Sequence, residues 1–546
     1  MKTKIIKDAV HKYIELDEPF WKTVNTAEFQ RLRWIEQTSY RALYPAAWHD
    51  RFIHSLGVFH LGKKAFSSLL ENARKREKDL LNANKDSFLL ACLLHDVGHA
   101  PFSHTCEDFF DNKITITKGI GKELVEAVEA SEMPSNEKEI LVADFTRLLD
   151  KSADTSKPPK PPAPHEIVSS IVVAKMFPDC CAYFGSRPLS LNLIIRCIIG
   201  CTHTTYQKDD KNVKREKGIK DCLIRLLNSS TSDVDKLDYL ARDAQMSGYD
   251  SVAIDTDRLM KGLCYVIDDQ GQYHPAFKKS ALSVIENVIA AKNSVAKWIL
   301  NHPTIIYERI LLRRSIGVAL KQLATQKSGE GKPDDNVTDA FIKSVFSTQS
   351  LSVAPQEGHP VRLLTDGDIL HFIKQAKSPH IDEFLNRSKR RHPVWKSAEE
   401  YANLCGDKEN AFKIASYLGP LVDASNPPDI SNLITLDDSF EQSDLSDENK
   451  KILKTIQQFF KKHGKQMDLL FGKAKRSFIM INPDDIYISF SDEKDFSTYK
   501  QLCDSILVQG SGDPAFQFFY MFTKEVIDAK EFISWLLREI LPLPTN

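Results

Sequence analysis

The segment 88–97 constrains the fold of this chain more than any other stretch. Its sequence, FLLACLLHDV, is apolar on every side of a helix and ends in the polar pair His95-Asp96. A helix without a polar face has to be buried all round, and Gly98 followed by Pro101 is typical of a helix end. The segment therefore predicts a core helix whose last turn places an imidazole and a carboxylate inside the protein.

Helical periodicity dominates the rest of the chain. Helices are expected over 167–176, 191–201, 222–228, 281–300, 305–324 and 450–466. Short β elements are expected near Ile5–Ile14 and within 475–491, where β-branched and aromatic residues are frequent. The predicted fold class is mainly α, with small β elements and an additional α+β region at the C-terminal end.

The overall composition is that of a soluble globular protein. Of 546 residues, 42% are hydrophobic and 27% charged, and the net charge is −1. Such a chain is not a globally basic nucleic-acid binder, and no apolar run reaches the about 18 residues of a transmembrane helix. The N-terminus has no apolar signal-peptide stretch, and the ten cysteines show no Cys-x-x-Cys spacing. We therefore expect a cytoplasmic protein with reduced thiols and no membrane partner.

Three irregular stretches predict the domain organisation. Residues 150–164 are rich in Pro and Lys, residues 325–337 are typical of a loop, and residues 424–449 are acidic and rich in Pro, Ser and Asn. We expect a core at 1–324 with an insert at 105–164, a helical extension at 338–423 and a further module at 424–546. The basic helix 450–466 is either a solvated helix face or a contact for nucleic acid or a partner protein.

Four side chains of the metal-ligand type lie in or beside apolar segments. They are His54, His95, Asp96 and Asp235. Two imidazoles and two carboxylates suit a divalent ion, and the candidates are Mn, Mg, Fe, Zn and Ni. Four protein ligands leave octahedral positions for water and a phosphate oxygen, and such an ion can activate water and polarise a phosphoryl group. The ligand set therefore indicates a phosphohydrolase.

These residues belong to four strings that follow one another in a fixed order. The strings are FQRLRWI at 29–35, RFIHSLGV at 51–58, HDVGHAPFSH at 95–104 and DVDKLDYLARD at 233–243. Together they resemble the HD superfamily of metal-dependent phosphohydrolases, and above all the deoxynucleoside triphosphate (dNTP) triphosphohydrolases of the SAM-and-HD-domain group. The resemblance covers about residues 1–320, with a weaker echo in LTDGDIL at 364–370. Because it begins near Lys4, we expect no SAM-type domain before the core.

The resemblance implies hydrolysis of a dNTP to a deoxynucleoside and tripolyphosphate. It implies a general acid at His104 oriented by Glu107, and a second catalytic pair at His165 and Glu166; histidine suits proton transfer near neutral pH. The positions implied to bind the substrate phosphates and sugar are Gln37, Arg51, His99, Lys236, Tyr239 and Asp243. The implied biological use is control of the dNTP pool or antiviral or anti-phage depletion of dNTPs.

The resembling enzymes also bind an activating guanine nucleotide between subunits, which implies a homo-oligomer, either a dimer or a tetramer. The matching positions here are Lys4, Asn25, Gln30 and Arg33. Asn25 stands where the family has an aspartate, and an amide has a single acceptor oxygen for the N–H donors of guanine. The segment is therefore either a nucleotide-sensing site with another preference or simply part of the fold.

A further departure concerns the base pocket. Pro303 and Leu311 stand where the resembling enzymes have residues that contact phosphate, sugar and base. We therefore expect an altered base specificity. If the helix register is shifted, Arg309 or Arg313 can supply the missing contacts. Two other functions stay open: an HD phosphohydrolase acting on another nucleotide or a nucleic acid end, and a nucleotide-sensing scaffold whose effector surface is the C-terminal third.

Overall fold

The structure, a computed structural model, describes most of the chain. The described residues are 2–110, 115–150, 161–204, 210–229, 233–249, 253–328, 364–425, 436–443, 445–474, 486–504 and 518–540. The chain divides into two compact units. Unit 1 comprises residues 1–295, 343–367 and 479–510, and unit 2 comprises residues 296–342, 368–478 and 511–546. Each unit is therefore assembled from segments that are far apart in the sequence.

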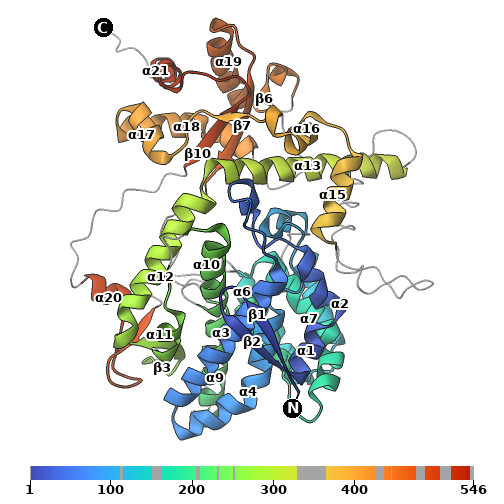
Figure 1. The fold of residues 1–546 in the computed structure, drawn as a ribbon, viewed down its shortest axis with the longest axis vertical. Coiled ribbons are helices and arrows are strands. Elements are labelled where there is room, and N and C mark those ends of the chain that lie inside the picture. The colour runs from blue at the N-terminus through green and yellow to red at the C-terminus, as the bar shows by residue number, and fades with distance from the viewer. Residues whose placement is uncertain are drawn as a thin grey trace. The chain divides into compact units, whose positions relative to one another are not determined.

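Unit 1 is built on long buried helices (Figure 1). These are α3 (Arg51–Asn72), α4 (Lys75–Leu94), α7 (Pro164–Phe184), α8 (Leu191–Ile199), α9 (Lys211–Leu227) and α10 (Val234–Ser247). Helix α4 packs against α3, α8 and α9, and α10 packs against α3. Every residue of α4 from Ser87 to Leu94 is buried, as the apolar segment predicts. His95 and Asp96 follow directly after this core helix.

Smaller elements surround these helices. The hairpin of β1 (Thr3–Asp8) and β2 (Lys12–Asp17) is antiparallel, with Ile6 opposite Ile14. The remaining helices of unit 1 are α1 (Glu18–Val24), α2 (Ala27–Gln30), α5 (Gly119–Ala130), α6 (Ser135–Leu149), α11 (Thr256–Lys261), α12 (Leu282–Val295) and α20 (Tyr499–Asp504). Short 3-10 turns form at Arg31–Trp34 and Ser103–Thr105.

A four-stranded sheet in unit 1 joins distant parts of the chain. Its order is β3 (Leu263–Ile267), β4 (Tyr273–Lys278), β8 (Tyr487–Ser489) and β9 (Phe496–Thr498). β4 pairs antiparallel with β3 and parallel with β8, so that Phe277 lies opposite Ile488. The C-terminal third of the sequence therefore contributes strands to the unit that contains α3, α4 and α10.

Unit 2 is an α+β structure. Its helices are α13 (Pro303–Ser328), α15 (Asp366–Gln375, whose first two residues belong to unit 1), α16 (Pro379–Leu385), α17 (Ala398–Cys405), α18 (Lys408–Ser425), α19 (Asp447–Lys462) and α21 (Ala529–Ile540), preceded by a π-helical turn at Ala296–Leu300. Its sheet has the order β5 (His392–Pro393), β10 (Phe519–Thr523), β7 (Asp468–Lys473) and β6 (Leu436–Asp437). Trp395, Phe471 and Phe519 are buried in its core.

The mainly α fold with small β elements is confirmed, and so are the expected helices and the N-terminal strands. The packing divides the chain differently from the boundaries expected at 324 and 424. One reason is that α13 continues to Ser328 and packs against β7 and α16; another is that β8 returns to β4. The Pro-rich residues 151–160, the loop beyond 328 and the expected strand at 478–481 lie outside the described residues.

Helix α7 is long and apolar enough to cross a membrane, contrary to the sequence-based expectation that no segment would be. In the structure, 56% of its apolar window is buried. Within unit 1 it packs against α1, α5 and α8. The buried core helix of a soluble protein has the same length and composition, so this single helix is weak evidence for a membrane span.

Candidate active site

The four predicted metal ligands converge at one point in unit 1. His54 lies in the first turn of α3, His95 and Asp96 follow α4, and Asp235 lies in the first turn of α10. His54 Nε2 is 3.0 Å from Asp235 Oδ1 and 3.6 Å from Asp96 Oδ2, and His95 Nε2 is 3.6 Å from each of these oxygens. Two consecutive helices, α3 and α4, and the distant helix α10 therefore bring two nitrogens and two oxygens together.

The other ring nitrogen of each histidine is already occupied. His54 Nδ1 donates to Asp238 Oδ2 at 2.8 Å, and His95 Nδ1 donates to the Cys92 carbonyl at 3.0 Å. These partners fix the ring orientation and leave each Nε2 directed at the cluster, as carboxylates and carbonyls do behind metal-bound histidines. Burial lowers the pKa of His54, but hydrogen bonds to Asp235 and Asp238 raise it to about 9.

The residues fit a divalent metal ion. Transition-metal ligand bonds are about 2.0–2.3 Å long, which separates neighbouring ligand atoms by about 3 Å. The four nitrogen–oxygen distances of 3.0–3.6 Å agree with this spacing, and His54, His95 and Asp96 offer ligand atoms that all lie within 4.8 Å of one another. In addition, His95 Nε2 is buried without a hydrogen-bond partner among the described residues, and a buried ring nitrogen of this kind needs a proton or an ion to satisfy it. The Asp235 side chain is 34% exposed, so the cluster is open on that side.

Arg51 connects this cluster to the loop that follows it. Its Nη1 donates to Asp96 Oδ2 at 2.7 Å, its Nε to Ser103 Oγ at 2.9 Å and its Nη2 to the Gln37 carbonyl at 3.2 Å. Burial raises the pKa of Asp96, but the charges of Arg51, His95, His99 and His54 together hold it well below its usual range. Arg51 is therefore engaged by the protein itself at the position where the sequence predicts a phosphate contact.

A second group of side chains, the His–Glu cluster, consists of His99, His104, Glu107 and His165. Glu107 Oε1 accepts hydrogen bonds from His104 Nδ1 at 3.0 Å and from His165 Nδ1. The same oxygen is 3.6 Å from His99 Nε2. His99 stacks on His165, with ring centroids 4.4 Å apart. One carboxylate oxygen is therefore shared by the two predicted catalytic histidines.

The charge states in the His–Glu cluster differ between its members. Burial lowers the pKa of His165, but Glu107 raises it to about 9. Glu107 also raises the pKa of His104, but burial, Arg51 and His165 together lower it below its usual value. Burial and the nearby Arg51 hold the pKa of His99 well below its usual range. Near neutral pH the cluster therefore carries its proton on His165, and its His104 side chain is 55% exposed.

The loop that carries His104 has an unusual backbone. Phe102 has φ 52° and ψ 29°, and Ser103 has φ 51°. The left-handed region costs an L-residue about 1–2 kcal/mol. Two such residues in succession need compensating contacts, and such conformations concentrate at functional sites. The hydroxyl of Ser103, which donates to the Glu36 carbonyl and accepts from Arg51, is one such contact.

The predicted sugar contacts form a separate group. Asp243 Oδ1 accepts from His49 Nε2 at 2.7 Å, and the Gln37 backbone N–H donates to the His49 carbonyl at 3.0 Å. Gln37 is 3% exposed, and its Oε1 has no hydrogen-bond partner among the described side chains. Burial and the carboxylates of Asp233, Asp235 and Asp243 raise the pKa of Tyr239, whose hydroxyl therefore stays protonated.

Two predicted site residues make other contacts in this structure. Lys236 Nζ donates to Asp233 and, at 2.7 Å, to the Ser229 carbonyl. Glu166 accepts from the Ala163 backbone N–H at 2.7 Å and from Asn228 Nδ2 at 3.0 Å, contacts that stabilise the start of α7. Lys236 therefore has to move before it can contact a phosphate, and Glu166 supports the helix that carries His165.

The predicted nucleotide-sensing residues lie in the N-terminal elements of unit 1. Lys4 Nζ is 4.1 Å from the centre of the Trp21 ring. Gln30 Nε2 donates to the Val24 carbonyl at 2.8 Å, while its Oε1 accepts from Arg33 Nε at 2.9 Å. Asn25 is exposed at the end of α1. These residues are accessible, but no contact joins Lys4 to Gln30 or Arg33 among the described side chains.

Sequence reasoning missed three residues that support the site: His49, Ser103 and Asp238. Each lies inside one of the quoted strings or within two residues of one, so proximity to a predicted ligand was the available signal. The two positions expected to alter base specificity are in unit 2, where Pro303 begins α13 and Leu311 is buried in the core.

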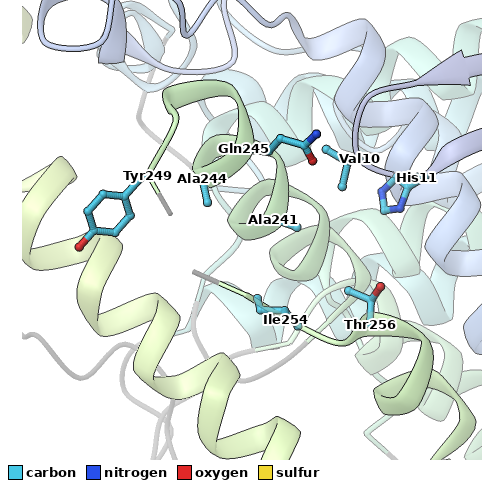
Figure 2. A pocket seen from close by; sticks show the side chains of 8 residues that line it. All are labelled: Val10, His11, Ala241, Ala244, Gln245, Tyr249, Ile254 and Thr256. Carbon is cyan, nitrogen blue, oxygen red and sulfur yellow. The ribbon is translucent and has the colours of Figure 1, made fainter. Parts of the chain in front are cut away.

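A pocket of about 360 Å³ lies beside the hairpin turn and α10 in unit 1. Figure 2 shows Val10 and His11 from the hairpin turn facing Gln245 of α10. Its eight lining residues include none of the metal-ligand candidates. His11 nevertheless connects the two regions, because its Nε2 donates to Asp238 Oδ1 at 2.6 Å and Asp238 in turn holds His54.

The comparison with known protein families matches one part of the chain. Residues 51–171 match the family model of the HD domain, and this stretch carries His54, His95 and Asp96. The match ends before Asp235, the fourth candidate ligand, which α10 contributes.

The individual relatives are more distant. The chain is 39% identical over 111 residues to the deoxynucleoside triphosphate triphosphohydrolase SAMHD1 of Xenopus laevis, a stretch covering 20% of this chain and 17% of the relative. It is 23% identical over 344 residues to the uncharacterized protein MJ1154 of Methanocaldococcus jannaschii, covering 62% of this chain and 55% of the relative. The chain therefore spans about half the length of the archaeal relative and a smaller share of the SAMHD1 protein.

The fold also matches solved structures. A phosphohydrolase from Bacteroides thetaiotaomicron superposes with a TM-score of 0.52 at 19% sequence identity, covering 95% of this chain and 99% of that one. At this identity the likeness concerns the fold alone.

Proposed function

We propose that this protein is a metal-dependent phosphohydrolase that cleaves dNTPs into deoxynucleoside and tripolyphosphate. The observation that carries the proposal is the pairing of two groups in one unit. In four nitrogen–oxygen pairs, the ligand atoms of His54, His95, Asp96 and Asp235 lie 3.0–3.6 Å apart, and Arg51 links them to the loop of His104. The HD domain and the partial similarity to SAMHD1 support this substrate class.

Different residues act on the α-phosphate and on the leaving group. When a divalent ion is bound by the four ligands, it supplies activated water and polarisation of the α-phosphate. The water oxygen forms a bond to the α-phosphorus, and the bond from that phosphorus to the sugar 5′-oxygen breaks. His104, which is exposed to the site, gives a proton to the departing 5′-oxygen, and Glu107 orients its ring.

His165 serves as the charged partner in this proposal. Glu107 keeps it protonated near neutral pH, so it can donate to a phosphate oxygen and recharge His104 through the shared carboxylate. The triphosphate raises the proton affinity of His104 once it is bound, because its negative charge favours the imidazolium. Glu166 acts by fixing the start of α7 beneath His165.

The residues proposed to bind the substrate make contacts within the protein in this structure. Lys236 exchanges its contact with Asp233 for one with the triphosphate, and His99 and Arg51 line the phosphate side. Gln37 and Asp243 bind the sugar hydroxyl, and Tyr239 packs on the sugar ring. Gln37 Oε1 is buried without a hydrogen-bond partner among the described residues, so it can accept a hydrogen bond from the sugar hydroxyl. Cytoplasmic dNTP-pool control, a homo-oligomer and an activating nucleotide at Lys4, Asn25, Gln30 and Arg33 belong to the same proposal.

The test is anion-exchange chromatography of reactions with each dNTP and rNTP. Reactions contain Mn²⁺ or Mg²⁺ and are run with single nucleotides and with mixtures, beside a His95→Ala control. We expect deoxynucleoside and tripolyphosphate from the wild-type protein, and a loss of at least about 100-fold in the variant. No cleavage of any dNTP in any mixture contradicts the dNTP assignment; cleavage of another phosphate ester then indicates the alternative phosphohydrolase.

A further inference from the structure

The left-handed loop at Phe102 and Ser103 is held by a residue from far along the chain. Asp366 Oδ1 accepts from the Phe102 backbone N–H at 2.6 Å, and its Oδ2 accepts from the Glu36 backbone N–H at 2.8 Å. Asp366 is 8% exposed. One buried carboxylate therefore ties the loop that carries His104 to the segment that leads into Gln37.

A second set of hydrogen bonds joins the start of this loop to the segment that precedes Gln37. Arg31 Nε and Nη2 donate to the Leu364 carbonyl at 2.9 and 2.7 Å. The same guanidinium donates to the His99 carbonyl at 2.7 Å and to the Val97 carbonyl at 3.3 Å. Arg31, which Leu364 holds, and Asp366 therefore contact the loop on the two sides of Pro101.

The backbone conformation makes these contacts informative. Phe102 and Ser103 are two of only three non-glycine residues with a positive φ in the described part of the chain. L-residues leave this region unless their surroundings hold them there. The Asp366 bond is made to the backbone N–H of Phe102 itself, at the first of the two left-handed residues.

We propose that Asp366 is a positioning residue of the active site. It holds the loop 99–104 in the conformation that places His104 beside Glu107, and so it sets the rate of the step in which His104 takes part. This role rests on the proposed function of the His–Glu cluster. It does not involve the metal ligands, because no hydrogen bond joins Asp366 to His54, His95, Asp96 or Asp235 among the described residues.

Burial raises the pKa of Asp366 to about 7, while the two backbone N–H donors at this position favour the carboxylate form. Both oxygens of Asp366 receive backbone N–H donors, and an amide of the same shape has one acceptor oxygen and an NH₂ group that faces the second donor. Asp366→Asn therefore keeps the volume of the side chain and loses one of the two bonds. Asp366→Ala loses both, and Asp368→Asn changes an exposed aspartate two residues later as the matched control.

The kinetic test compares these three variants with the wild-type protein. We expect kcat to fall about 10- to 100-fold in both Asp366 variants, since a small misplacement of a catalytic group has an effect of this size. The amount of bound Mn²⁺ should stay within about twofold, since no hydrogen bond joins Asp366 to a metal ligand among the described residues, whereas KM can rise because His99 of this loop is a proposed phosphate contact. Unchanged kcat, or a loss of bound Mn²⁺ that parallels the loss of kcat, overturns the positioning role.

Hydrogen–deuterium exchange gives a readout that does not depend on activity. We expect faster exchange in peptides covering residues 97–106 of Asp366→Asn, and wild-type exchange in Asp368→Asn. Unchanged exchange in this loop overturns the proposal whatever the kinetics show. If the wild-type protein cleaves no dNTP while the loop still responds to Asp366→Asn, the substrate assignment fails and the positioning contact stands.

Discussion

Asp238 supports three partners with one buried carboxylate. It accepts from His54 Nδ1, from His11 Nε2 and from Arg242. A Cβ at Gly57 would lie 1.9 Å from Asp238 Oδ1, so this close approach of α3 and α10 requires a glycine. The carboxylate holds the proton on His54 Nδ1, so that Nε2 is left as the ligand atom.

Replacing Asp238 by Asn should therefore weaken metal binding. An amide cannot accept from all three donors, and a support of this kind is worth about 10- to 100-fold in metal affinity. Isothermal titration of the metal-free protein with Mn²⁺ measures the effect. Asp257→Asn, which changes an exposed aspartate paired with Lys64, is the control and should bind Mn²⁺ like the wild-type protein. Wild-type affinity in a folded Asp238→Asn protein would contradict this role.

At the residue scale, the sequence was most informative at His and Asp residues that lie in apolar segments. Buried His and Asp side chains in apolar segments are costly unless they are paired or bind a metal, so His54, His95 and Asp96 could be singled out, and the structure brings them together. The contacts of Lys236 and Arg51 could not be foreseen. A long cationic side chain reaches several partners, and only the folded chain decides between a phosphate and a neighbouring carboxylate such as Asp233.

At the element scale, the contact between the α4 end and α7 depends on Gly98. A Cβ at this position would lie 2.3 Å from the Ser169 backbone nitrogen. The Gly98 N–H also donates to Ser169 Oγ at 3.0 Å. Because the helix that carries His165 packs here, the spacing of α7 from the metal-ligand pair is set by the absence of one methyl group.

Gly98→Ala should destabilise the protein by about 1–3 kcal/mol, because backbone atoms of α7 have to move to admit the methyl group. Urea denaturation followed by circular dichroism measures the free energy of unfolding. Gly419→Ala is the matched control, since nothing lies within 4 Å of the added Cβ there, and it should change stability by less than about 1 kcal/mol. Equal effects at both positions would show that the close approach to Ser169 is not limiting.

Elements with a strong hydrophobic pattern were predictable from sequence. The segment ending at Leu94 is apolar all round and forms the buried α4, and alternation near Ile5 and Ile14 gives the hairpin. The left-handed turn at Phe102 was not predictable, because its residues have no intrinsic preference for that conformation. It depends on Asp366, which lies 264 positions away in the chain.

At the scale of the whole molecule, unit 1 is discontinuous. Ile488 of β8 is fully buried opposite Phe277 of β4. Sequence patterns indicate strands but give no partner, because pairing between distant strands depends on the complete fold. The expected boundary at residue 424 therefore differed from the packing, which returns 479–510 to unit 1.

Ile488→Ala should destabilise unit 1 although it lies in the C-terminal third of the sequence. Loss of a buried Ile side chain costs about 2–5 kcal/mol. Limited proteolysis with mass spectrometry should detect earlier cleavage within residues 263–278 than in the wild-type protein. Lys494→Ala, an exposed position between β8 and β9, should leave the cleavage pattern unchanged. Unaltered cleavage in Ile488→Ala would contradict the pairing of β8 with β4.

The pairing of β4 with β8 also bears on how the protein is made. The four candidate metal ligands are synthesised before the last strands of either sheet. The sheet of unit 1 needs β9, and the sheet of unit 2 needs β10. The sheet of unit 1 can be completed only after residue 498 has been synthesised, and the sheet of unit 2 only after residue 523. A nascent chain, or one shortened by a premature stop codon, can therefore hold every metal ligand and still lack the strands that complete both units.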